Sequence, residues 1–236
     1  MTHSIHQKGF DSFTTTEYVE GVGPLRDALT ESGFIVDYLP AHIAMREFPS
    51  STDELAEYAC VILSDIGANS LLLHPDTFAA SRPTGHRLRA LAQYVRGGGG
   101  LVMIGGYMTF QGIDGKGRWH GTAVEDVLPV VISPVDDRVE EPAGIQPITV
   151  AQHSILDGVD GRWPDLLGYN RVTADPVADV LVKVGDDPLL VVADIDLGRS
   201  AAFTSDCAPH WAPPPFVDWQ HYQRLWGQLV GWVVGQ

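Results

Sequence analysis

The sequence predicts an α/β protein in which a mostly parallel sheet carries helices on both faces, with extra β-hairpin elements in the second half. Short apolar runs alternate with helical stretches along residues 1–110. These runs are continuous, which is typical of parallel strands because helices cover both of their faces. The resulting order of helix, strand, helix, strand, helix, strand is the order in which such sheets are built.

The first half alternates between the two element types. Leu25 and Leu29 recur at helical spacing, and Gly33 follows as a stop signal. The segment 51–54 is a capping-box-like helix start, and the glycines at 97–100 connect a helix to a strand. We predict, in order, a helix over 18–32, a strand over 34–39, a helix starting at 51–54, a strand over 58–64, a helix over 83–96 and a strand over 101–104.

Shorter strands and turns dominate the second half. The turn at 185–188 joins two apolar runs and predicts a hairpin, and the last segment places Trp219 and Trp226 on one helical face. No repeat or linker interrupts the chain, so residues 1–236 are predicted to form one domain. We predict a short helix over 122–128, strands over 130–132, 148–150, 180–184, 189–193 and 201–204, and a helix over 216–234.

The amino-acid composition indicates the cellular compartment and limits the classes of binding partner. The chain has 236 residues and a formal net charge of −15, with Lys and Arg scattered, so a nucleic-acid partner is not expected. No apolar run reaches the ~20 residues of a membrane span, and the N-terminus lacks the apolar core of a signal peptide. The two cysteines, Cys60 and Cys207, suggest no disulfide framework. We expect a soluble cytoplasmic protein without nucleic-acid or membrane partners.

Candidate site residues follow the ends of predicted strands, where open α/β sheets bind ligands. Asp65 and Asn69 follow one strand, Tyr107 a second, and Asp206 and His210 a third. Asp206 and His210 are candidates for a carboxylate–imidazole pair, and Tyr107 for a hydrogen-bond donor or general acid. The structural alternatives are a turn or helix cap for Asp65 and Asn69, and a packed aromatic turn for Tyr107.

Other reactive side chains are not expected to form a site. Cys207 lies three residues before His210, an unusual arrangement for a cysteine nucleophile, and we interpret it as a packed thiol. The histidines show no zinc spacing and no glycine motif opens a helix, so neither a metal nor a cofactor is predicted. Trp211 is a candidate to stack on a planar or sugar-like ligand, with core or interface packing as the alternative.

The strand and glycines at 98–107 resemble the elbow strand of class I glutamine amidotransferase-like proteins. Further segments resemble the bacterial branch of uncharacterised cytoplasmic members, which is related to trehalose-utilisation-like proteins: 6–14, 64–69, 105–117 and 204–211. The resemblance implies a flavodoxin-like sheet in three layers. It also implies a cysteine at the elbow of active members, where this chain has Gly106 and Tyr107, and an acid and a histidine after a late strand, where it has Asp206 and His210.

Without the elbow cysteine the covalent route is closed, so amidotransferase activity is not expected. The leading interpretation is a small-molecule binding protein, with a sugar-like ligand held by Asp65, Asn69, Tyr107, Asp206, His210 and Trp211. One alternative is a hydrolase in which Asp206 and His210 activate water. Another is an assembly protein that contacts a second copy, as a homo-oligomer, through the proline-rich segment 209–216.

The start of the chain carries one more expectation. Relatives begin with a strand before the segment 6–14, whereas this chain begins at Met1, inside the loop that follows that strand. We expect that the native start lies upstream of Met1; the alternative is that the fold lacks one central strand. A missing central strand leaves two strand edges unpaired.

Overall fold

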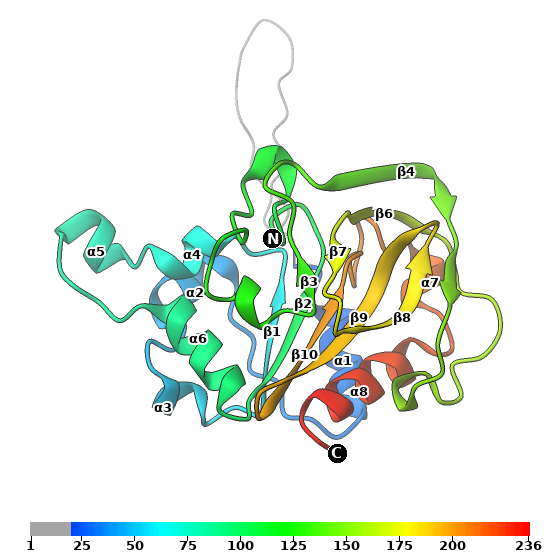
Figure 1. Ribbon diagram of the computed structural model, residues 1–236, viewed down its shortest axis with the longest axis horizontal. Coiled ribbons are helices and arrows are strands. Elements are labelled where there is room, and N and C mark those ends of the chain that lie inside the picture. Colours follow the sequence, from blue (N-terminus) through cyan, green and yellow to red (C-terminus); the bar gives the residue numbers. More distant parts are fainter. Residues whose placement is uncertain (1–19) are drawn as a thin grey trace, which may run out of the picture.

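The computed structural model describes residues 20–236 and centres on a six-stranded sheet (Figure 1). The strand order is β1-β2-β10-β9-β8-β5. β1 and β10 both pair parallel to β2, whereas the pairings β10-β9, β9-β8 and β8-β5 are antiparallel. The strands are β1 Cys60–Ser64, β2 Gly100–Ile104, β10 Gly198–Phe203, β9 Asp187–Ile195, β8 Asp179–Val184 and β5 Pro147–Thr149.

The α/β fold and the hairpin elements of the second half are confirmed, but the mostly parallel, flavodoxin-like sheet is not. Short turns explain the difference. Gly185 and Asp196 adopt positive φ values of 57° and 52° in the turns that join β8 to β9 and β9 to β10. Turns this short reverse the chain and can join only antiparallel strands, because parallel strands need a crossover of about a dozen residues or more.

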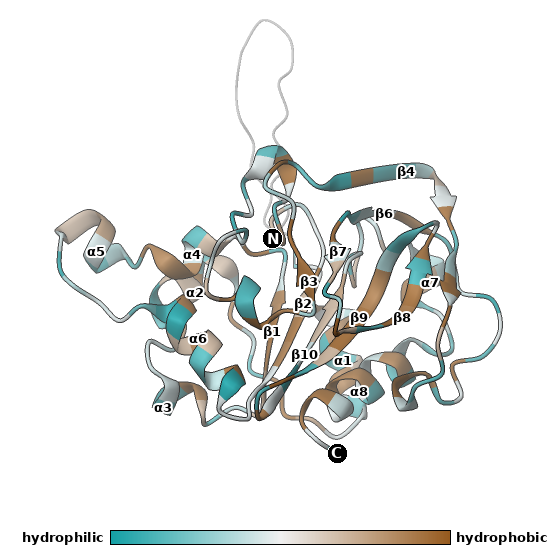
Figure 2. Ribbon diagram, in the orientation of Figure 1, coloured by the Kyte–Doolittle hydropathy of each residue, from teal (hydrophilic) through white to brown (hydrophobic). Residues whose placement is uncertain are grey.

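Two apolar cores lie on opposite faces of the sheet, and β2 contributes to both. Val102 and Ile104 belong to the core that contains buried residues of α1, α7 and α8. Leu101 and Met103 belong to the core that contains buried residues of α2, α4 and α6. Figure 2 shows the apolar colouring along the central strands that this double coverage requires. The helices are α1 Gly23–Glu31, α7 Pro214–Val217, α8 Tyr222–Val233, α2 Ala41–Glu47, α4 Ala68–Leu72 and α6 Arg87–Arg96.

Smaller elements surround this frame, and several were not predicted. The helix expected over 122–128 is only a 3-10 turn, Glu125–Val127, which ends before Pro129. Neither α2 nor the antiparallel pair of β4 and β6 was predicted. The remaining elements are α3 Thr52–Leu55, α5 Pro75–Ala80, 3-10 turns at Ile113–Gly115 and Ser154–Leu156, and strand pairs β3 Val130–Val131 with β7 Thr173–Ala174 and β4 Arg138–Ile145 with β6 Leu166–Asn170.

The segment after α1 corrects another prediction. α1 begins with Pro24 at its first turn and ends before Gly33, which has a φ of 93°; residues 18 and 19 of the predicted helix lie outside the described residues. Residues 34–39 form no strand of the described chain, so the strand predicted there is wrong.

The proline-rich segment 209–216 does not present its aromatic side chains. Trp211 is 1% exposed and Phe216 is fully buried. The contact surface expected for an assembly protein is therefore not formed by these rings. Within residues 20–236, no helix has the length and apolar character that crossing a membrane requires.

Candidate functional site

Three parallel strands end on the same rung of the sheet. In the register of the sheet, Ser64 of β1 and Phe203 of β10 both pair with Ile104 of β2. The residues that follow, Asp65, Gly105 and Thr204, therefore leave the sheet side by side at its carboxyl edge. This is the edge where the sequence placed the candidate site.

Asp65 turns the chain as it leaves β1. Its φ of 45° lies in the left-handed region, which Asp tolerates better than most residues. The turn lets its Oδ1 accept a hydrogen bond of 2.9 Å from the backbone N–H of Met108, which ties the end of β1 to the loop after β2. Burial raises the pKa of Asp65, and the negative charge of Asp206 adds to the rise.

Gly106 occupies the elbow after β2. Its φ is 148°, a value that side-chain-bearing residues rarely adopt, and its N–H donates to Asn170 Oδ1 at 3.0 Å. A Cβ at this position would lie 3.0 Å from Asp65 Oδ1. The strained backbone of an elbow is thus present, and it presents no side chain.

A buried polar network below the elbow holds this loop. Asp137 accepts hydrogen bonds of 2.8 Å from the N–H groups of Gln111 and Gly112 and from the side-chain amide of Asn170. Burial raises the pKa of Asp137, while these donors act in the opposite direction. Since Asn170 also accepts from Gly106, the network fixes both ends of the loop.

Asp206 and His210 meet, as the sequence predicted for a carboxylate–imidazole pair. Asp206 Oδ1 accepts hydrogen bonds from the N–H groups of Cys207 and Ala208, at 2.7 and 3.2 Å. Its Oδ2 lies 3.7 Å from His210 Nδ1, an ion-pair distance rather than a hydrogen bond. The Asp206 carboxylate raises the pKa of His210, against an opposing effect of burial, and Asp65 adds to the rise.

Tyr107 links the elbow to this pair. Its ring stacks on His210, with centroids 4.9 Å apart and 21° between the planes, and meets the edge of Trp211 at 5.5 Å. The Arg138 guanidinium carbon lies 5.4 Å from the centre of the same ring. Burial raises the pKa of Tyr107, and the negative charge of Glu140 adds to the rise.

Two of the predicted ligand-binding residues do not join the group. Asn69 lies on α4 and is exposed, with none of the contacts that join the other candidates. Trp211 is buried, and its Nε1 donates to Glu140 Oε2 at 3.0 Å. Trp211 therefore supports Tyr107 from inside the protein, and its face is not open to a stacked ligand.

Cys207 fits the prediction of a packed thiol, whereas Cys60 is half-buried. Cys207 is 3% exposed, and its Sγ lies 3.8 Å from Ser64 Oγ. Burial raises its pKa, which is the reverse of what a cysteine nucleophile needs. No group of three or more His, Cys, Asp or Glu side chains within residues 20–236 is arranged to hold a metal ion.

Sequence reasoning missed the residues that surround Tyr107 and the elbow from β4 and β6. They are Arg138, Glu140 and the pair Asp137–Asn170, which follow no strand of the parallel set. The dense charges at 136–141 were the available signal, since five charged positions interrupted by one valine suit a site wall as well as a solvated strand.

The fold and its loops define an α/β protein in which an acid and an imidazole group meet beside a glycine turn at the carboxyl edge of the sheet. The family model described as "Putative glutamine amidotransferase" matches residues 1–235. The chain therefore belongs to this glutamine amidotransferase-like family, as the resemblance predicted.

Solved structures agree with the family. A cytoplasmic protein from Salmonella typhimurium is 41% identical, with a TM-score of 0.94 over 98% of this chain and 94% of that chain. A second, from strain LT2, is also 41% identical, with a TM-score of 0.93 over 98% and 95%. A "Putative thua-like protein" from Parabacteroides merdae shares 14% identity and a TM-score of 0.58 over 90% and 84%, a likeness of fold alone. The search of curated proteins gave no match.

Proposed function

We propose that this protein binds a small, hydroxyl-bearing ligand at the carboxyl edge of β1, β2 and β10 and does not act as a glutamine amidotransferase. The observation that carries the proposal is the convergence of Tyr107 and the Asp206–His210 pair, with Asp65 close enough to interact electrostatically with both Asp206 and His210. We also propose a cytoplasmic location, since both Salmonella relatives are described as cytoplasmic proteins.

The chemistry of these groups favours a neutral, sugar-like ligand. Carboxylates such as Asp65 and Asp206 accept hydrogen bonds from ligand hydroxyl groups, and an anion would meet two like charges. His210, whose side chain is 29% exposed, can donate to a ligand oxygen when it is protonated. The aromatic surface of Tyr107 suits the apolar face of a ring.

Glutamine hydrolysis by the thioester route lacks its nucleophile in this chain. Gly106 stands at the elbow without a side chain, and the buried Cys207 thiol has a raised pKa. The phenol of Tyr107 has its pKa raised above an already high ordinary value, so it is a weak nucleophile at neutral pH.

Thermal-shift screening against sugars, polyols, amino acids and nucleotides tests the binding proposal. We expect a stabilising hit among the hydroxyl-rich compounds that weakens in Tyr107→Ala and in His210→Ala. Asn69→Ala is the matched control, because Asn69 follows the same strand as Asp65 but lies outside the group. A hit that survives both site variants, or the absence of any hit, contradicts the proposal.

A second candidate, a hydrolase, is favoured by one contact. Asp206 orients His210 through the same Nδ1 that a catalytic carboxylate would hold, which leaves Nε2 to take a proton from water. Incubation with chromogenic esters and glycosides tests this. Hydrolysis that disappears in both Asp206→Asn and His210→Gln supports the hydrolase, and hydrolysis that persists in either variant excludes it.

Self-association remains a separate proposal. Size-exclusion chromatography with light scattering distinguishes a 25.6 kDa monomer from a homo-oligomer.

A further inference from the structure

A groove of about 570 Å³ follows one face of α8, where its lining residues recur every three or four positions. Ser32 and Phe34, at the end of α1 and after it, line the groove as well, as does Ser154 of a 3-10 turn. The volume lies within the range of small-molecule sites, about 300–1,000 Å³. The residues that α8 and its two ends contribute are Gln220, Gln223, Arg224, Gly227, Gln228, Gly231, Trp232 and Gln236.

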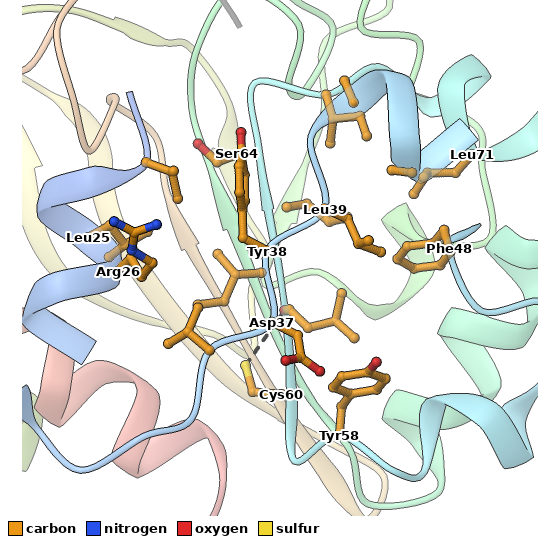
Figure 3. Close-up of a pocket in the computed structure, with 18 of the residues that line it drawn as sticks. Leu25, Arg26, Asp37, Tyr38, Leu39, Phe48, Tyr58, Cys60, Ser64 and Leu71 are labelled. Carbon is orange, nitrogen blue, oxygen red and sulfur yellow. Dashed lines mark hydrogen bonds between the residues drawn. The ribbon is translucent and has the colours of Figure 1, made fainter. Parts of the chain in front are cut away.

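The chemistry of this groove is that of neutral amides. Four of the nine glutamines of the sequence line it, whereas no Asp or Glu of residues 20–236 does, in a chain with 30 acidic residues. Its one charged lining residue, Arg224, donates through Nη1 to the carbonyl of Gly158 at 2.7 Å. The cavity beside β1 is different in kind, because its lining is mostly apolar, with Leu25 and Phe48 among its walls (Figure 3).

Two glycines one turn apart on α8 need a physical reason, since glycine destabilises a helix interior relative to alanine. A Cβ on Gly227 would lie 2.4 Å from Ser32 Oγ, so Gly227 lets the end of α1 approach α8. A Cβ on Gly231 would meet only Gln236 Oε1, at 3.9 Å. Packing therefore explains Gly227 but not Gly231, and the missing side chain of Gly231 keeps the groove open.

Gln228 and Trp232, also one turn apart, are held in place by their neighbours. Gln228 Nε2 donates to the carbonyls of Ser154 and Asp157, at 2.7 and 3.1 Å. Both amide hydrogens are thus used, while Oε1 is buried without a partner among residues 20–236. The Arg199 guanidinium carbon lies 4.9 Å from the centre of the Trp232 ring. Because a buried acceptor without a donor is unfavourable, Gln228 favours a ligand that carries O–H groups.

We propose that this groove is a binding site for a neutral oligosaccharide, separate from the site at the carboxyl edge of the sheet. Sugar hydroxyl groups donate and accept hydrogen bonds, as do the side-chain amides of Gln220 and Gln223. The aromatic surfaces of Phe34 and Trp232 suit the apolar faces of sugar rings. From Gln223 to Trp232 the helix extends about 14 Å, a length that suits a chain of rings better than a single ring.

Other ligand classes match the lining less well. A cationic ligand would find no carboxylate among the described lining residues. An anionic ligand would meet Arg224 alone, already hydrogen-bonded, in a chain with a net charge of −15. An apolar helix or peptide would cover the amides of Gln220 and Gln223 without giving them hydrogen-bond partners, which is unfavourable. The lining therefore favours a ligand that is neutral and rich in hydroxyl groups.

Titration calorimetry of the full-length protein tests the proposal. The probes are the neutral trisaccharides cellotriose, maltotriose and mannotriose, and the control is trigalacturonic acid, a trisaccharide whose rings carry carboxylates. We expect at least one neutral probe to bind in the millimolar range or more tightly. Trigalacturonic acid should not bind, because the groove offers it no free cationic partner.

Variants place the binding in the groove. Gly231→Gln puts a side chain into the open position and should abolish binding. Gln223→Ala removes one amide and should weaken binding about fivefold. Gln93→Ala is the matched control, because Gln93 is an exposed glutamine of α6 outside the groove, and it should leave binding unchanged. Far-ultraviolet circular dichroism checks that each variant folds, and Gln223→Ala still tests the proposal if Gly231→Gln does not.

His210→Ala separates this proposal from the one at the carboxyl edge. Because the groove shares no lining residue with that site, the variant should bind the trisaccharide as the native protein does. Binding that is lost in His210→Ala but kept in Gly231→Gln would put the sugar at the carboxyl edge, which supports the proposed function and overturns the groove. The groove is also excluded if no neutral trisaccharide binds, or if trigalacturonic acid binds equally well.

Discussion

The rings of Tyr107 and His210 lie nearly face to face, 4.9 Å apart and 21° from parallel, although they come from loops that follow different strands. The contact joins the elbow to the acid–imidazole pair. We expect Tyr107→Leu to lower the free energy of unfolding by about 1 kcal/mol and Tyr107→Phe, which keeps the ring, to lower it by less. Urea unfolding measures both, and equal losses would show that the stack contributes nothing.

The pKa of His210 should depend on its two carboxylate neighbours in a fixed order. Asp206 is the larger influence and Asp65 the smaller, so Asp206→Asn should lower the pKa of His210 more than Asp65→Asn does. Titration of the imidazole Cε1–H signal by NMR measures this. A larger effect of Asp65→Asn would mean that the 3.7 Å pair of Asp206 and His210 does not form in solution.

The stability of the folded protein should depend on pH through the same Asp206–His210 pair. Because the folded pKa of His210 is raised, its favourable contribution is complete below the unfolded pKa, near 6.5, and fades as pH rises through the folded value. The stability difference between the native protein and His210→Gln should therefore be larger at pH 6 than at pH 9. A difference that grows with pH would have the wrong sign for a protonated His210 held by Asp206.

The hydrogen-bond network under the elbow should contribute more to the free energy of unfolding than an exposed amide side chain does. Asn170→Ala leaves the N–H of Gly106 and one acceptor site of buried Asp137 without a partner, and should cost about 1–3 kcal/mol of unfolding free energy. Asn69→Ala, on the exposed face of α4, should change stability by less than about 0.5 kcal/mol. Similar losses in the two variants would remove the structural role that we assign to Asn170.

Two glycines should respond to alanine in opposite directions. A Cβ on Gly168 would lie 2.4 Å from Trp211 Nε1, so Gly168→Ala must displace a buried indole and should cost about 1–3 kcal/mol. Gly231 lies within α8 with only the end of the Gln236 side chain near its Cβ position, at 3.9 Å, and Gly231→Ala should stabilise by about 0.4–1 kcal/mol. Thermal unfolding of the two variants decides, and a neutral Gly168→Ala would mean that Trp211 is loosely held.

Both cysteines should resist a thiol reagent in the native protein. Burial raises the pKa of Cys60 to about 12 and raises that of Cys207 as well, so little thiolate exists at pH 8. Ellman's reagent should report no fast thiol in buffer and both thiols in denaturant. A fast-reacting Cys207 in the folded protein would reopen the question of amidotransferase chemistry.

Local sequence patterns predicted those strands that are specified by the residues within them. The strands β1, β2, β8, β9 and β10 were predicted within a few residues because each is a continuous apolar run between turn signals. The direction of pairing was harder. It depends on Gly185 and Asp196, whose short turns make the β8-β9 and β9-β10 pairings antiparallel. Turns were recognised at 185–188 and at 196–199, but only the first was interpreted as a hairpin.

Only those candidate site residues that directly follow a parallel strand could be predicted from the sequence. Asp65, Tyr107, Asp206 and His210 follow parallel strands, and the common rung of those strands brings them together. Arg138 and Asn170 lie on β4 and β6. No periodicity in the sequence indicates which loop an antiparallel strand pair will face. Trp211 was misplaced because a large aromatic residue beside prolines carries no sequence signal that separates packing from ligand contact.

Placing a cysteine nucleophile at the glycine elbow would take more than one substitution. A cysteine substituted at Gly106 would inherit a backbone angle that resists side chains, and its Cβ would stand 3.0 Å from Asp65 Oδ1. Beside that carboxylate and Asp206, the new thiol would hold its proton and stay inert. A cysteine at position 106 would therefore need a second change, at Asp65, before its thiol could ionise.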